Sequence, residues 1–141
     1  MASFNKINQF VEDLCLKIHD FRAAQDIVKV LLTNTAPVAT NSITGDLVEI
    51  ADGNGYIEGG IDIQNDQSES SGTLTVTSAA DPVFLAAGGT IGPFRYVAMY
   101  NSTPSTPLGP LMGWWDYGSN VTLQDGETFT VDFGASVFTI T

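Results

Sequence analysis

The first 26 residues carry apolar side chains at intervals of three and four positions, which is the period of an α-helix. These side chains belong to Phe4, Ile7, Phe10 or Val11, Leu14 and Ile18. The stripe predicts an amphipathic helix over residues 4–19 that can pack either on the body of its own chain or on a neighbouring subunit. Because the first 32 residues contain no glycine, proline or threonine, residues 1–26 are expected to form an N-terminal helical segment.

Beyond residue 26 the hydrophobic period becomes two, which indicates β-strands. Apolar and polar residues alternate in segments 26–34, 72–78, 94–101, 111–118, 120–125, 128–133 and 137–141. The spacers between these segments are rich in proline, glycine, asparagine and aspartate, and none of the later spacers has a helical pattern. We therefore expect a mainly β fold, with residues 27–141 forming an antiparallel β-sandwich that resembles a jelly roll. The polar stretch "QNDQSESSG", residues 64–72, is predicted to be an exposed loop.

The charge of the chain is strongly acidic and unevenly placed. Sixteen aspartate and glutamate residues face five lysine and arginine residues, for a net charge of −11. After residue 29 the only basic side chain is Arg95, for which we expect a structural ion pair. Direct binding of nucleic acid is excluded, because it requires clustered cations. No apolar run is long enough to span a membrane, and the polar N-terminus does not resemble a signal peptide, so a soluble protein made in the cytoplasm is expected.

Candidate catalytic chemistry is sparse. The sequence has one cysteine, Cys15, and one histidine, His19. On a helix they would share one face, but two ligands do not complete a zinc site, and packing of both residues is the better interpretation. Cys15 is accordingly expected to be a small core residue. The many carboxylates single out no catalytic pair, so we predict that the protein is not an enzyme and uses no metal or cofactor.

The stretch "ADGNGYIEGG", residues 51–60, has the glycine and acid content of a ligand-binding loop. A calcium loop starting at Asp52 fails at Tyr56 and Ile57, and a dinucleotide loop lacks its third glycine at Glu58. A Walker loop needs a lysine that the sequence does not supply. We therefore predict two sharp turns that bring Tyr56 and Ile57 into or alongside the sandwich, leave Asp52 and Glu58 in solvent, and hold no ion or phosphate.

Adjacent tryptophans suggest an interaction surface. In a strand, Trp114 and Trp115 would point to opposite faces, and the outward ring would be a sugar platform, a partner anchor or a partly buried edge residue. The candidate protein-interface residues are Phe4, Ile7 and Phe10, if the helix reaches a partner, and Trp115, if its ring faces outward. Each of the four is equally interpretable as part of the core of its own chain.

Several segments together resemble a known family. They are "FNKINQFVEDLCLKIHDF", "VKVLLTNTAPVATNS", "EIADGNGYIEGG", "TIGPFRYVAMYNSTP", "PLMGWWDYGSNVTLQDGETFTVDF" and "VFTIT". In this order they resemble small structural proteins of tailed bacteriophage virions, some of which are similar to capsid cement or decoration proteins.

The resemblance implies a β-sandwich body, a homotrimer, binding to the major capsid protein on the capsid exterior, and no catalytic residue. A tail or baseplate component with carbohydrate binding is the alternative. An acidic body agrees with a position outside the shell, away from the packaged DNA.

Overall fold

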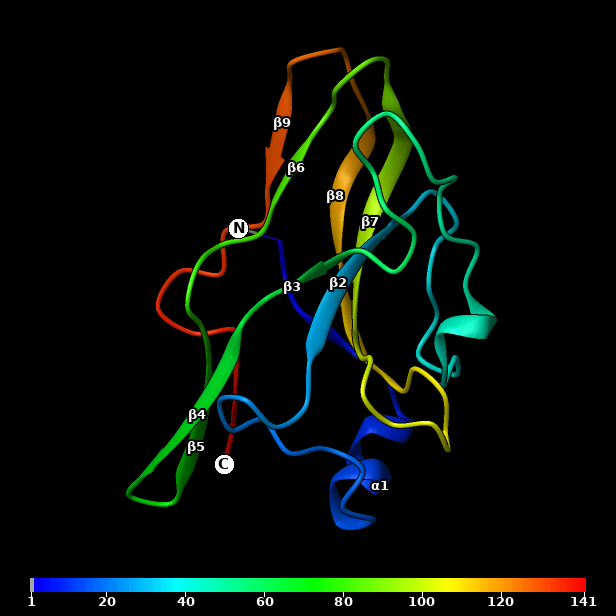
Figure 1. Ribbon diagram of the computed structural model, residues 1–141. Coiled ribbons are helices and arrows are strands. Elements are labelled where there is room, and N and C mark those ends of the chain that lie inside the picture. The colour runs from blue at the N-terminus through cyan, green and yellow to red at the C-terminus, as the bar shows by residue number, and fades with distance from the viewer. Residues whose placement is uncertain (1) are drawn as a thin grey trace.

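The computed structural model describes residues 2–141 and shows a mainly β protein with one short α-helix (Figure 1). The elements are β1 (Asn5–Lys6), α1 (Gln9–Cys15), β2 (Val28–Thr33), the 3₁₀ turn η1 (Thr44–Asp46), β3 (Ile61–Asp62), β4 (Asn65–Ser70), β5 (Thr73–Ser78), β6 (Val83–Leu85), β7 (Ile91–Asn101), β8 (Leu111–Leu123), β9 (Thr128–Thr130) and β10 (Phe138–Ile140). All strand pairs are antiparallel. The expected mainly β class with antiparallel pairing is therefore confirmed.

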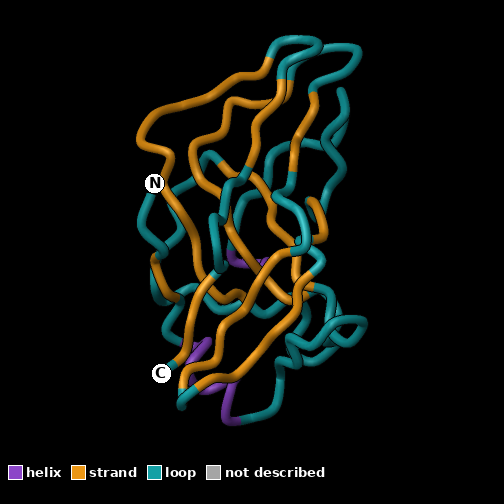
Figure 2. Tube along the Cα trace, turned by 90° about the vertical axis from the view of Figure 1, so that its left-hand side faces the viewer, coloured by secondary structure: helices purple, strands orange, loops and turns teal. Residues whose placement is uncertain are grey.

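The largest sheet has five strands in the order β1-β8-β7-β2-β3. Its centre is the pairing of the two long strands β7 and β8, with β2 on the other side of β7. A three-stranded sheet, β10-β5-β4, and a two-stranded ribbon, β6-β9, complete the strands. The ribbon lies at the opposite end of the molecule from α1, and the C-terminus lies at the α1 end (Figures 1 and 2).

Aromatic contacts join the smaller sheets to the large one. Phe94 of β7 packs edge-on against Phe129 of β9, with 5.0 Å between ring centroids. Phe4, just before β1, stacks on Phe138 of β10 at 5.9 Å. Because aromatic side chains bury large apolar areas, these pairs are natural anchors between sheets.

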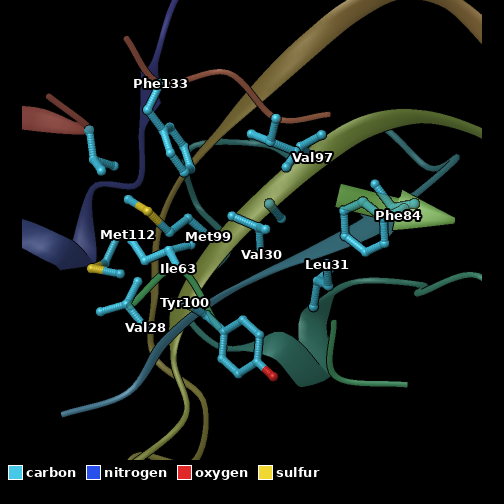
Figure 3. Close-up of a cluster of buried hydrophobic side chains, with 14 of the residues drawn as sticks. Val28, Val30, Leu31, Ile63, Phe84, Val97, Met99, Tyr100, Met112 and Phe133 are labelled. Atoms are coloured by element: carbon cyan, nitrogen blue, oxygen red, sulfur yellow. The ribbon is translucent and has the colours of Figure 1, made fainter. Parts of the chain in front are cut away.

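Both faces of β2 are covered by apolar side chains. Val30 pairs with Met99, and the two side chains lie on one face of the sheet, whereas Leu31 lies on the other face (Figure 3). Val30, Leu31 and Met99 are each at most 1% exposed. A strand that is buried on both faces reads as a nearly continuous apolar run, which is what "VKVLL" shows.

The loop over residues 49–60 is fastened to β2. The Tyr56 hydroxyl donates a 2.5 Å hydrogen bond to Glu49 Oε1 and accepts one from the Leu32 backbone N–H. Tyr56 is 2% exposed, as predicted, but Ile57 is 72% exposed, so its predicted placement in or alongside the body was wrong. Asp52 and Glu58 are exposed, as predicted. The Asp52 carboxylate accepts a hydrogen bond from the Glu58 backbone N–H, which identifies it as a support of the turn.

The N-terminal helix is much shorter than residues 4–19. Residues 5 and 6 form β1, which pairs with Gly113 and Trp114 of β8, and the Ile7 N–H donates to the Met112 carbonyl. Backbone pairing with an existing strand outweighs the weak helical preference of a short segment. The helix begins only at Gln9, and the N-terminal segment is bound to the sheet by its backbone.

The segment predicted as a loop at residues 64–72 contains strand β4. It pairs with β5 over six residues and forms a hairpin whose turn residues, Ser71 and Gly72, both have positive φ. Such turns match the twist of antiparallel strands. The prediction failed because β4 is polar on both faces and therefore shows no hydrophobic alternation, although the segment is mostly exposed, as expected.

Candidate functional site

An apolar pocket of about 250 Å³ opens between the N-terminal residues, β8 and the segment that follows β9. Its lining consists of Ala2, Phe4, Val97, Trp115, Tyr117, Phe129, Thr130, Val131, Asp132, Phe133, Ser136 and Val137. We call this cavity the aromatic pocket, because five of these side chains carry phenyl, phenol or indole rings. Segments from both ends of the sequence meet here, so the pocket exists only in the folded chain.

The rings of the aromatic pocket contact one another in two groups. Trp115 lies 5.1 Å from Phe4 and 5.5 Å from Phe133, measured between ring centroids. Tyr117 lies 5.5 Å from Phe129. Adjacent rings are inclined by 52° to 73° in these pairs, so the rings do not share one plane. The arrangement makes walls around a cavity and not a flat platform.

The register of the large sheet sets the direction of Trp115. It pairs with Val97 of β7, whereas Trp114 pairs with Ala98, and the side chains of consecutive residues lie on opposite faces. Trp115 therefore shares its face with Val97 and with the core residue Val30, so the condition of the interface prediction, an outward-facing ring, is not met. Its ring remains half-buried because the pocket leaves part of it uncovered.

The four residues predicted for an interface divide into two pairs. Phe4 and Trp115 are brought together in the aromatic pocket. Ile7 and Phe10 are 1% and 3% exposed and belong to the core of their own chain, so they present no free surface to a partner. Phe10 packs edge-on against Phe21 and Phe138, which occupy the space that a partner would need.

The sequence did not predict that the other three rings, Phe129, Phe133 and Tyr117, would line a pocket. The alternation in "TFTVDF" correctly placed Phe129, Val131 and Phe133 on an apolar face, since Val131 and Phe133 are buried. It gave no sign that this face continues into an open cavity. Tyr117 belongs to an irregular part of β8, where the pairing with β7 shifts, so the simple alternation of sides does not apply to it.

Of the two carboxylates near the aromatic pocket and β8, Asp116 is paired with a basic side chain of the described residues and Asp132 is not. Arg95 forms a bidentate ion pair with Asp116, with N–O distances of 2.7 and 3.0 Å, which confirms the predicted ion pair. Hydrogen bonds from Arg95 lower the pKa of Asp116 below its usual value. Asp132, which lines the aromatic pocket, is exposed, and its Oδ1 accepts a hydrogen bond from the Gly134 N–H. Within residues 2–141, no basic side chain lines the pocket.

A cluster of aromatic and polar side chains surrounds His19. Its ring stacks on Phe21 and contacts Phe10 edge-on, which confirms the packing role predicted for it. The Asn101 amide nitrogen lies 3.1 Å from His19 Nδ1 and donates a 2.7 Å hydrogen bond to Asp26. Burial lowers the pKa of His19 more than the charges of Asp13 and Asp26 raise it. His19 Nε2 and Asp13 Oδ2 are buried without a partner among the described residues.

Cys15 does not belong to this cluster. The residue ends α1 and is exposed, so the predicted core position was wrong. The helix ends there because Lys17, two residues beyond Cys15, has a positive φ of 59°, which a continued α-helix does not allow.

Comparisons with known proteins add no family to this description. No family model, curated protein or solved structure matches the chain. Within residues 2–141, no three histidine, cysteine, aspartate or glutamate side chains are grouped so that they could hold a metal ion. The helices of the same residues include none that is long and apolar enough to cross a membrane.

Proposed function

We propose that this chain is a non-enzymatic capsid cement protein of a tailed bacteriophage, which binds the outer surface of the major-capsid shell and stabilises it. The observation that carries the proposal is the aromatic pocket, an open cavity lined by the half-buried rings of Phe4 and Trp115. Tryptophan and tyrosine side chains are common anchors of protein interfaces. The resemblance of the sequence to virion structural proteins supplies the identity of the partner.

Two properties of the chain agree with this role. The net charge of −11 makes a place next to packaged DNA unfavourable and a place on the outside of the shell favourable. The proposed body is a β-sandwich, with the five-stranded sheet as one layer and the two smaller sheets as the other, and the proposed assembly is a homotrimer. Because like-charged copies repel, contacts between them would be apolar and hydrogen-bonded.

The capsid role is tested by adding purified protein to capsids assembled without it. We expect wild-type protein to bind the shell and to raise its melting temperature, and the Trp115→Leu variant to bind more weakly. Light scattering and circular dichroism of the free variant would show that it is still folded. Cryo-electron microscopy of the virion that places this chain only in the tail would contradict the proposal.

A tail or baseplate component that binds carbohydrate is the second candidate. It is favoured by polar groups beside the rings, since Thr130, Asp132 and Ser136 line the same pocket. Sugars are commonly held by an aromatic ring together with a few hydrogen-bonding side chains. A glycan array that stays negative at high protein concentration would remove this candidate and leave the capsid role unaffected.

A further inference from the structure

The aromatic pocket has the chemistry of a cation site. The faces of aromatic rings attract cations, most strongly in tryptophan, and a nearby carboxylate adds to the attraction. Five rings and the carboxylate of Asp132 line this pocket. We propose that it binds the positively charged side chain of an arginine that a partner polypeptide presents.

Charge complementarity supports a cationic occupant. The chain beyond residue 29 carries twelve carboxylates and a single basic residue, Arg95. The guanidinium of Arg95 is already bound to Asp116 in a bidentate pair. Asp132 uses Oδ1 for the Gly134 N–H, and the structure gives its Oδ2 no hydrogen bond within residues 2–141. No basic side chain of the described residues lines the pocket, so a cation that pairs with Asp132 there would be supplied by a partner.

Size and shape favour a single side chain. Pockets for drug-sized ligands usually enclose about 300–1,000 Å³, and this cavity has about 250 Å³. Its rings are inclined to one another by 52° to 73°, which suits a rod-shaped side chain held between walls better than a sugar lying on a platform. Arginine fits better than lysine, because a guanidinium can stack on a ring and bind a carboxylate at the same time. The inference does not depend on the capsid role.

The test uses nuclear magnetic resonance with N-acetyl-arginine amide as the probe. Its control is N-acetyl-citrulline amide, which has nearly the same shape but no charge. We expect the arginine probe at millimolar concentration to shift the indole N–H signal of Trp115 in a saturable way. The signal of Trp114, on the opposite face of β8, should stay in place, and the citrulline probe should bind at least about fivefold more weakly.

Two variants locate the charge that is responsible. Asp132→Asn keeps an oxygen for the Gly134 N–H and should weaken arginine binding about fivefold. Asp125→Asn is the matched control, since Asp125 is also exposed, also accepts a glycine N–H, from Gly88, and does not line the pocket. It should bind arginine as the wild type does.

Three results of the arginine and citrulline experiments would overturn the proposal. They are equal binding of the two probes, unchanged arginine affinity in Asp132→Asn, and no shift of Trp115 with either probe up to its solubility. A shift of Trp115 by methyl glucoside with none by arginine would also overturn it and would favour a sugar site. Both variants carry their substitution at an exposed residue. The dispersion of the amide signals in the same samples reports whether each variant is folded.

Discussion

The ring of Phe4 lies against the backbone of Gly113 so closely that a Cβ atom on Gly113 would fall 2.2 Å from Phe4 Cε2. The glycine therefore makes room for one wall of the aromatic pocket. Gly113→Ala should push the ring outward and lower the free energy of unfolding by about 1–3 kcal/mol. Urea unfolding would measure the loss.

The control for this substitution is Gly45→Ala, where the new Cβ would meet only Ile43 at an ordinary 3.6 Å. It should change stability by less than about 0.5 kcal/mol. In a Phe4→Ala background, Gly113→Ala should cost less than in the wild type, because the clash with the ring is gone and only the 2.7 Å contact with the Asn5 carbonyl oxygen remains. Additive effects of the two substitutions would show that the ring does not occupy the space above Gly113.

Removing the hydroxyl of Tyr56 should loosen the loop that covers β2. Tyr56→Phe keeps the stacking on Phe84, at 5.7 Å between centroids, but leaves Glu49 and the Leu32 N–H without this partner. We expect a loss of about 1–3 kcal/mol in the free energy of unfolding. Tyr117→Phe removes an exposed hydroxyl and should be nearly neutral, and equal effects of the two variants would contradict the role given to Tyr56.

Gly60 and Gly72 have similar backbone angles but different surroundings. Their φ values are +76° and +84°, yet a Cβ on Gly60 would lie 1.8 Å from the Val30 carbonyl oxygen, and one on Gly72 would meet nothing within 4 Å. Gly72→Ala should cost about 1–2 kcal/mol through backbone strain. Gly60→Ala should lower the free energy of unfolding by more than about 3 kcal/mol, because the new Cβ would force the loop away from the backbone of β2. Thermal unfolding would compare them, and similar melting temperatures would show that the approach of Gly60 to β2 contributes nothing.

The burial of His19 makes stability depend on pH. Because burial lowers the pKa of His19, the unfolded chain binds a proton more readily than the folded one. The contribution of the neutral ring is complete above the ordinary pKa of about 6.5 and is lost as the pH falls through the lower folded value. His19→Gln should flatten the stability profile between about pH 7 and pH 5.

Since His19 is the only histidine in the sequence, its ring signals in a proton spectrum can be followed without ambiguity. A midpoint at or above the ordinary value would contradict the direction of this shift. In that case the carboxylates of Asp13 and Asp26 would outweigh burial as the influence on the ring.

The strands were predictable wherever one face is apolar and the other polar. Alternation located β5, where Val76 is buried between half-buried neighbours, and it also located β7 and β10. The same criterion missed β4, which is held by backbone pairing to β5 and carries polar residues on both faces. It also extended α1 backwards over residues 4–8, since spacing alone does not reveal that a neighbouring strand binds this backbone.

The candidate site was predictable only in part. Phe4 and Trp115 were both candidates for an interface or for the core, and their rings do contact each other. Phe133 contacts Trp115 and Tyr117 contacts Phe129, from segments whose approach depends on the packing of three sheets and on the irregular part of β8. A single sequence carries no information on such long-range contacts, so the pocket as a whole became visible only in the folded chain.

The β4-β5 hairpin offers a position for engineering. It extends away from the rest of the molecule (Figure 1), and both residues of its turn, Ser71 and Gly72, are exposed. Exposed tips with small residues tolerate inserted chain well. A peptide epitope or fluorescent tag spliced between Ser71 and Gly72 would therefore project into solvent without entering the aromatic pocket, and a set of such fusions would turn this chain into a display scaffold.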